Sequence, residues 1–428
     1  MTSLTAQRRS FIKWLAGVPV LATIAGRELS NKLSAAVGKA STPNVYERIG
    51  VRPFINARGT WTYLSGSLEL PEVHTAMEAA SQQFVDMFEL QRAAGKRLAE
   101  ISGAESGMVT SGAAGAMAAA TAACIAGKDQ ARIWQLPDTT GLKNEVIMLG
   151  GRSPFDSAIR LVGARLVMSP SPADLRGVIT DKTAMVYTTW RDERLEKALA
   201  ITKEAGVPLL LDDAAGIPPI QNLSRYAKAG ADLYCFSGGK GLRGPQCSGL
   251  LLGRKDLIEA ALANCSPWEG AVCRAMKVGK EEIIGLLAAV EAWSRIDLKK
   301  LNDEWGKRVG RIAKLVEMVP GVSSDIRIPT EGNSYPTLTV RWDEKKFGLT
   351  VEECDQQLRV SNPRIEVLTS SNPSLLSVIH EGGPKEQALA RKPNQLQIVS
   401  MTLQEGEDLV VGQRLRDILR NALKNASR

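Results

Sequence analysis

The sequence predicts an α/β fold, with a large domain built on a mostly parallel sheet between helices and a smaller α+β C-terminal domain. Three observations support this prediction. Apolar runs alternate with helical patterns from Glu105 onward, which is typical of a parallel sheet. Several runs are apolar on both faces, as in strands that helices cover on both sides. The composition, with 44% hydrophobic residues, 38 glycines and 5% aromatic residues, suits an α/β protein better than a β-sandwich.

The large domain is expected to contain six strands with helices between them. A glycine follows the charged helical pattern at Gly206, as at many helix C-termini. Polar clusters follow several of the runs, and in parallel sheets binding sites gather at the carboxyl ends of strands. The expected strands cover 107–110, 145–149, 165–168, 184–189, 207–213 and 231–239. The expected helices cover 113–126, 153–163, a short segment near Ala173 and 191–206.

The pattern changes after a long helical stretch that begins at Lys280 and runs to about Met318. Short strand-like runs and one helix then predict the small domain, which a C-terminal helix closes after Gly406. The strand-like runs are 335–342, 364–368, 376–379 and 396–400, and the helix is 350–358. The predicted organisation is a signal or anchor segment (1–40), an N-terminal arm contributing to a dimer and its active site (41–75), a large domain (76–300) and a small domain (301–428).

The N-terminus resembles a twin-arginine export signal. Arg8 and Arg9 precede an apolar run from Trp14 to about Ala25, which is too short to span a bilayer comfortably and fits a signal-peptide core. The expected location is therefore periplasmic or membrane-associated, with the export machinery as a partner. A basic amphipathic helix of a cytoplasmic protein is the alternative, and an uncleaved anchor remains open.

Charge and metal-binding residues narrow the classes of function. The net charge is +8, of which the first 40 residues carry +5, so the remaining +3 does not favour a nucleic-acid partner. The six cysteines form no CxxC pair, and the chain contains only two histidines, His74 and His380. This pattern disfavours a metal site or a histidine-based triad.

A lysine in a glycine-rich turn is the first sign of chemistry. Lys240 follows the apolar run 231–236 within the stretch FSGGKGLRGPQ. A partly desolvated lysine there is suited to bond an aldehyde. Asp212 ends another apolar run and could hold a pyridine nitrogen protonated, and the small Ala214 would let a flat ring lie against the strand end.

A second fragment predicts a phosphate cradle. Ser111, Gly112 and Ala113 stand at the start of an expected helix, where free N–H groups and the helix dipole favour a phosphate. Ser237 could add a contact. A phosphate loop of the nucleotide-binding type is the alternative for the lysine turn, but Gly241 stands where that motif needs Ser or Thr. Lysine, carboxylate and cradle together predict a pyridoxal 5'-phosphate (PLP) site.

These residues lie within stretches that resemble the fold-type I PLP enzymes of the selenocysteine synthase-like and D-glucosaminate-6-phosphate ammonia-lyase group. The resemblance extends from about Tyr46 to the C-terminus. It is carried by YERIGVRPFINARGTWTYLSGS, PEVHTAMEAASQQFVDMFELQ, GMVTSGAAGAM, PLLLDDAA, FSGGKGLRGPQ and CRAMKVGKEE.

The resemblance implies a role for each candidate residue. It makes Lys240 the Schiff-base lysine, Asp212 the partner of the pyridinium nitrogen, and 111–113 with Ser237 the phosphate contacts. It also implies a site between subunits, a homodimer or larger assembly, and a place for Asn56 beside the cofactor. One departure is Gly151, which stands where relatives often carry a histidine that stacks on the ring.

The expected activity is an α,β-elimination of the ammonia-lyase type, through a Lys240 Schiff base, on an amino acid or amino-sugar acid. Transfer, racemisation, aldol cleavage and transamination share the first steps and remain alternatives, as does an inactive homologue. Selenium transfer on tRNA is disfavoured because an export signal precedes Tyr46. Arg274, Lys277 and Arg364 are candidate clamps for substrate anions, with surface salt bridges as the alternative. No role is assigned to Arg243.

Overall fold

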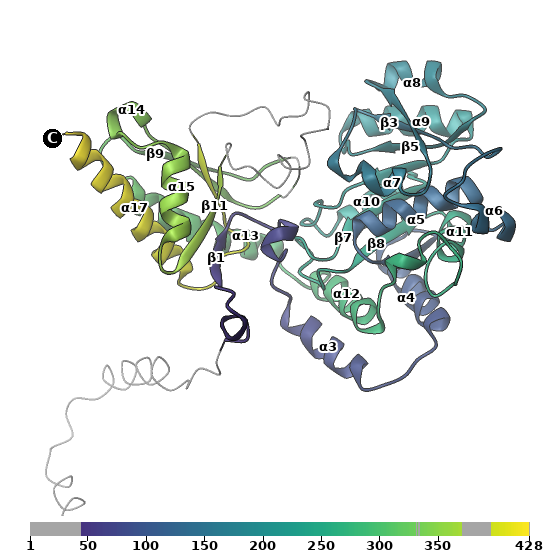
Figure 1. Cartoon of the computed structure of the whole chain (residues 1–428), viewed down its shortest axis with the longest axis horizontal. Coiled ribbons are helices and arrows are strands. Elements are labelled where there is room, and N and C mark those ends of the chain that lie inside the picture. The colour runs from purple at the N-terminus through teal and green to yellow at the C-terminus, as the bar shows by residue number, and fades with distance from the viewer. Residues whose placement is uncertain (1–43, 331, 333, 370–394, 428) are drawn as a thin grey trace, which may run out of the picture. The chain divides into compact units, whose positions relative to one another are not determined.

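The computed structural model describes residues 44–427 except 331, 333 and 370–394 (Figure 1). The export-signal segment with Arg8 and Arg9, the expected strand 376–379 and His380 lie outside the described residues. The described residues before Phe54 belong to a unit of their own. In this unit the short 3-10 helix η1 (Glu47–Ile49) ends at Gly50, which adopts a left-handed conformation with φ 78°.

The sheet of the large domain has seven strands in the order β2-β8-β7-β6-β5-β3-β4. The neighbours from β7 to β4 are parallel, and β8 runs antiparallel to both β2 and β7. The predicted α/β class with a mostly parallel sheet is therefore confirmed. The strands are β2 (Ser106–Thr110), β3 (Glu145–Leu149), β4 (Arg165–Ser169), β5 (Thr183–Thr188), β6 (Leu209–Asp212), β7 (Leu233–Ser237) and β8 (Gly249–Gly253).

Alternate side chains of these strands enter two separate hydrophobic cores. In β3, Ile147 and Leu149 belong to one core, and Val146 and Met148 belong to the other. Both faces of the sheet are therefore covered, which explains why β3 is buried along its whole length. The first core contains α3 (Pro71–Ser81), α4 (Met87–Ser102), α8 (Pro172–Val178), α9 (Glu193–Ala205), α10 (Asn222–Lys228) and α12 (Lys280–Trp293). The second contains α5 (Ala113–Ala126), α6 (Gln130–Gln135), α7 (Ser157–Arg160) and α11 (Lys255–Ala263).

The small sheet has five strands in the order β1-β11-β12-β10-β9 and its own hydrophobic core. Its first strand comes from the N-terminal end of the chain and pairs in parallel with β11, with Asn56 opposite Glu366. The strands are β1 (Phe54–Ala57), β9 (Ser323–Arg327), β10 (Thr337–Arg341), β11 (Arg364–Thr369) and β12 (Leu396–Val399). The helices on this core are α13 (Leu298–Val316), α14 (Glu344–Phe347), α15 (Val351–Val360) and α17 (Glu407–Ala426).

The structure departs from the expected elements in several places, and the strands β1 and β9 were not predicted. The expected long helical stretch consists of two helices, α12 and α13. The first helix ends at Trp293, and Asp297 caps the second by accepting from Lys300 N at 3.1 Å. The expected helix over 153–163 shortens to a 3-10 turn and the four residues of α7. The strand β8 was not predicted. Among the described residues, no helix is both long and apolar enough to cross a bilayer.

Candidate functional site

The Lys240 turn lies between the antiparallel strands β7 and β8, and close backbone packing holds it. Gly238 N donates to Ser248 O at 2.8 Å, and Gly244 N donates to Gly238 O at 2.9 Å. A Cβ atom on Gly241 would lie 1.7 Å from Ile217 O. The turn therefore requires a glycine next to the lysine, because no side chain fits between the two backbones.

Lys240 lies in a mostly apolar environment next to acidic groups. Burial lowers the pKa of Lys240, and Asp212 and Asp213 act in the opposite direction. The lysine Nζ lies 5.8 Å from the centroid of the Phe155 ring. An amine with a lowered pKa carries a larger neutral fraction near pH 7, and only the neutral amine attacks a carbonyl.

Asp212 is held at the carboxyl end of β6 by three donors. Tyr187 Oη donates to Oδ2 at 2.8 Å, Ala214 N donates to Oδ1 at 3.0 Å, and the Cys235 thiol lies 3.8 Å from Oδ1. Asp212 as a whole is only 8% exposed. Burial and Asp212 both raise the pKa of Tyr187, so this hydroxyl stays a donor. The orientation of the carboxylate is thus fixed by its neighbours.

The next residue, Asp213, belongs to a different set of contacts. Its carboxylate pairs with Arg191 at 3.0 Å and accepts from Tyr226 Oη at 2.7 Å. Burial raises the pKa of Asp213 to about 6, although Arg191 and Tyr226 act in the opposite direction. Arg191 also donates to Gly332 O at 3.3 Å. Asp213 therefore connects the strand end to the segment before β10.

The N-terminus of α5 lies beside this strand end. Gly112 precedes the helix with φ 96°, and a Cβ atom on Gly249 would lie 2.4 Å from the Gly112 carbonyl carbon. Gly249 pairs with Ser237 across β7 and β8. The helix start is consequently brought next to Ser237, where its free N–H groups and positive dipole end suit an anionic group.

A small cavity lies at the same helix start. One part of its wall comes from the end of β2 and the start of α5, and another part comes from the chain after α11. The lining residues are Gln91, Met108, Val109, Thr110, Ser111, Gly115, Cys265, Ser266, Met276 and Val278. Hydroxyl-bearing residues from two separate segments therefore border this position.

The segment between β1 and α3 runs along the Lys240 turn. Ser67 N donates to Gly239 O at 3.0 Å, and Leu70 N donates to Arg243 O at 2.9 Å. Arg243 has a positive φ of 53°, and its Nε donates to Leu68 O at 2.9 Å. Gln246 Nε2 donates to Thr62 O at 3.1 Å. Arg243, to which the sequence analysis assigns no role, thus attaches this segment to the turn.

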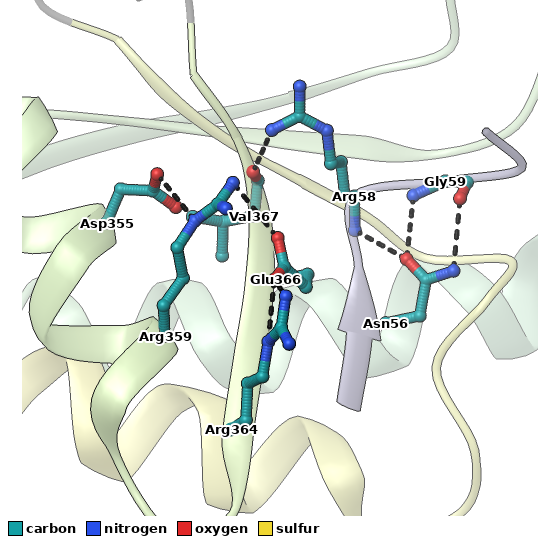
Figure 2. A network of polar contacts seen from close by, with 8 residues as sticks. All are labelled: Asn56, Arg58, Gly59, Asp355, Arg359, Arg364, Glu366 and Val367. Atoms are coloured by element: carbon teal, nitrogen blue, oxygen red, sulfur yellow. Dashed lines mark hydrogen bonds and ion pairs between the residues drawn. The ribbon is translucent and has the colours of Figure 1, made fainter. Parts of the chain in front are cut away.

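Asn56 is one of the sequence-predicted substrate residues, and it shapes a turn (Figure 2). Its Oδ1 accepts from Arg58 N at 3.0 Å and from Gly59 N at 3.1 Å, and its Nδ2 donates to Gly59 O at 3.0 Å. Arg58 is 2% exposed and donates to Val367 O at 3.0 Å. These hydrogen bonds show that Asn56 stabilises the turn at the end of β1.

Arg364 lies in the same network and neutralises a buried acid. Arg364 Nε donates to Glu366 Oε1 at 2.8 Å, and Arg359 pairs with Glu366 Oε2 at 3.1 Å (Figure 2). Glu366 is fully buried, so removing either arginine would leave a less compensated charge. The proposed contact of Arg364 with substrate stays a prediction.

The remaining predicted residues lie near the cavity or the lysine. Lys277 is exposed between two residues that line the cavity, Met276 and Val278, and Arg274 is half-buried in the preceding 3-10 turn η4 (Arg274–Met276). Beyond Gly151, Arg152 pairs with Asp156. Phe155 in the same segment is 54% exposed, and its ring lies 5.8 Å from Lys240 Nζ.

The large-domain candidates converge, but the sequence missed several of their neighbours. Lys240, Asp212 and Ala214 lie together, and Ser237 N donates to Ala214 O at 3.2 Å. Tyr187 and Phe155 were missed because nothing in their local sequence distinguishes them from core residues. The sequence shows two adjacent aspartates, Asp212 and Asp213. Only the fold shows that they bond to different partners, Tyr187 for Asp212 and Arg191 with Tyr226 for Asp213.

No protein-family model matches the chain. The D-glucosaminate-6-phosphate ammonia lyase of Salmonella typhimurium is 31% identical over 335 residues, which cover 74% of this chain and 87% of that protein. The 5'-C-glycyluridine monooxygenase-decarboxylase of a Streptomyces species is 33% identical over 339 residues, covering 75% and 83%. A solved structure of D-glucosaminate-6-phosphate ammonia-lyase matches with a TM-score of 0.73 and 29% identity, over 89% of this chain and all of that one.

Proposed function

The chain belongs to the family of fold-type I PLP-dependent enzymes that includes D-glucosaminate-6-phosphate ammonia lyase, and from this premise we propose that it eliminates ammonia from a small amino acid or amino-sugar acid. The observation that carries the proposal is the half-buried Lys240 amine, with its lowered pKa, near the fixed Asp212 carboxylate, at the edge of the sheet next to a helix N-terminus. The relationship to a named ammonia lyase supports the reaction class.

The described residues fit PLP at each of its reactive positions. Lys240 would carry the aldehyde carbon, Asp212 would face the ring nitrogen, and the start of α5 with Ser111 and Ser237 would face the phosphate. The bound cofactor would supply an electron sink for negative charge on the carbon beside the substrate amine. The open space around a Cβ atom on Gly112 agrees with a group placed close to the backbone there.

Two residues of the protein contribute to the reaction: Lys240 moves a proton, and Asp212 places a negative charge at the ring nitrogen. Lys240, with its lowered pKa, can accept the proton from the carbon next to the amine. For a 2-amino-3-hydroxy acid, the hydroxyl group takes up that proton and leaves carbon 3 as water. Carbon 3 then gains a proton from solvent, and a second water replaces nitrogen at carbon 2. The net products are a 2-keto acid and ammonia. Tyr187 keeps the Asp212 carboxylate in one orientation throughout.

The reaction can be tested with the PLP-loaded full-length protein and a panel of amino acids and amino-sugar acids. We expect ammonia and 2-keto acid in equal amounts without oxygen consumption. Lys240→Ala should lower turnover by about a thousandfold or more and abolish borohydride-trapped PLP on this peptide. The control is Lys277→Ala, which removes an exposed lysine and should keep the trapped PLP.

Oxygen-dependent release of carbon dioxide would instead favour chemistry of the kind named for the Streptomyces relative. Formation of an inverted amino acid or of an amino-group transfer product would favour racemisation or transamination. Unchanged turnover in Lys240→Ala would reject the assignment of the lysine.

The chain is further proposed to act as a homodimer or larger assembly. Four apolar side chains close together in the sequence, Val45, Tyr46, Ile49 and Val51, are each more than half exposed, and association with a second copy would remove such side chains from water. Light scattering after size exclusion should give at least twice the chain mass. A monomer at micromolar concentration would contradict the proposal.

Export by a twin-arginine route is proposed for the same chain, from the Arg8-Arg9 pair and the short apolar run after it. Such a route carries folded protein, so a cofactor bound in the cytoplasm would be carried along. Replacing both arginines by lysine should retain the protein in the cytoplasm. An unchanged distribution between cell fractions would reject this location.

A further inference from the structure

Cys265 and Cys273 lie side by side just after α11. Their backbones form an isolated parallel β-bridge, and Cys273 N donates to Asn264 O at 3.2 Å. The Cys273 thiol raises the pKa of the Cys265 thiol, so the two side chains are close neighbours, and both cysteines are free thiols in this structure. Both residues are buried, Cys265 at 7% and Cys273 at 0% exposure. The pair takes no part in the proposed reaction.

The geometry of this pair suits a disulfide. Paired strands lie about 4.7–4.9 Å apart, and disulfides join Cα atoms about 4.4–6.8 Å apart. Side chains of directly paired residues leave the ladder on the same side, so the bridge between Cys265 and Cys273 brings their side chains together. We propose that Cys265 and Cys273 form a disulfide in an oxidising compartment, and that this bond fixes one wall of the cavity at the start of α5.

The proposed disulfide would lie in the wall of the cavity at the start of α5. Cys265 and Ser266 line the cavity that also contains Ser111 and Gly115. The bond would close the loop over 266–272, whose tip from Trp268 to Gly270 is exposed. A closed loop has fewer open conformations, so the wall next to the candidate phosphate position would open less often.

The oxidation is a thiol–disulfide exchange with a disulfide donor, such as an oxidised dithiol protein or glutathione disulfide. One thiolate attacks the donor disulfide and releases a thiol, and the second thiolate attacks the mixed disulfide and releases the other thiol. Two electrons and two protons pass to the donor. The neighbouring thiol and burial raise the pKa of Cys265, so the exchange should require opening of the exposed loop tip.

The test uses the full-length protein incubated with glutathione disulfide and then denatured. We expect the loss of two of its six titratable thiols and a mass lower by two hydrogen atoms. A peptide map without reductant should show 265 joined to 273. Cys265→Ser and Cys273→Ser should each abolish this change, whereas Cys247→Ser, at an exposed cysteine, should keep it.

Six free thiols after incubation, or a cross-link that uses another cysteine, would overturn the pairing. The effect on the cavity rests on the proposed PLP site and has its own readout, the rate at which PLP is lost on dilution. We expect slower loss from the oxidised protein, and equal rates in both redox states would overturn this part. The thiol count does not depend on turnover, so its failure is distinct from failure of the proposed reaction.

Discussion

Lys240 is half-buried, and burial lowers the pKa of its amine. The sequence allowed this residue and Asp212 to be predicted as a pair, because each follows an apolar run and such runs end at one edge of a parallel sheet. The sequence could not predict Tyr187, which belongs to the apolar run of β5 and reaches the carboxylate only through strand order.

We expect Tyr187→Phe to weaken both the fold and cofactor binding. The substitution removes the 2.8 Å hydrogen bond to Asp212 Oδ2, and losing a partner of a buried charged group costs about 1–3 kcal/mol. Urea unfolding and PLP titration of the apo protein measure the two effects. The control is Tyr234→Phe, which loses a 3.0 Å bond to Leu223 O and should change stability only. Equal PLP affinity in wild type and Tyr187→Phe would contradict the prediction.

The reactivity of Lys240 should follow a pH profile shifted to the acidic side. Burial lowers its pKa, so reductive methylation of the apo protein by formaldehyde should reach half of its limiting rate below the ordinary lysine value of about 10.4. Asp212→Asn removes a charge that favours the ammonium form, so the midpoint should fall further. Peptide mass spectrometry at each pH measures the extent of modification. A midpoint at or above the ordinary value would refute this.

At the scale of elements, the apolar patterns predicted most of the parallel strands of the large sheet, but they did not predict the antiparallel strand β8 that pairs with β2 and β7. The range 145–149 matches β3 and 113–126 matches α5, because continuous apolar runs and an alanine-rich helix leave little ambiguity. The short run at 249–253 gave no signal of the antiparallel strand β8. The helical pattern after Lys280 also hid the break before Asp297, where a local cap decides the boundary.

The backbone contact at Gly241 predicts a severe effect of a single methyl group. Gly241→Ala would place Cβ 1.7 Å from Ile217 O, and relieving such a clash costs about 1–3 kcal/mol or more. Urea unfolding should show this loss, together with weaker trapping of PLP at Lys240. Gly177→Ala in α8 is the matched control, since nothing lies within 4 Å of the added atom. A loss as large in the control would contradict the explanation.

At the scale of the whole molecule, the buried acid Asp213 makes stability depend on pH. Burial raises its pKa from 3.8 to about 6, so between these values the folded protein binds more protons than the unfolded chain. The contribution of Asp213 to the free energy of unfolding is therefore greatest below about pH 4, and it is lost as the pH rises to about 6. A shift of about two units corresponds to about 3 kcal/mol.

Comparison of the wild type with Asp213→Asn isolates this contribution. The difference in unfolding free energy, wild type minus variant, should fall by about 3 kcal/mol between pH 3 and pH 7. Asparagine keeps the size of the side chain and an acceptor for Tyr226, so the comparison removes mainly the titration. Chemical denaturation at several pH values provides the measurement, and a difference that does not change with pH would disprove the assignment.

The pairing of β1 with β11 also sets an order of events during synthesis. Arg58 and Val367 are hydrogen-bonded across 309 positions of sequence, and ribosomes add about 5–20 residues per second. The strand β1 therefore waits about 15–60 s for its partner after it is made. Throughout that time the backbone groups of β1 that later pair with β11 are free to pair with other chains. A fragment that starts at residue 301 lacks β1, so it would leave the corresponding edge of β11 unpaired. The nascent protein should consequently depend on a holding chaperone until translation ends.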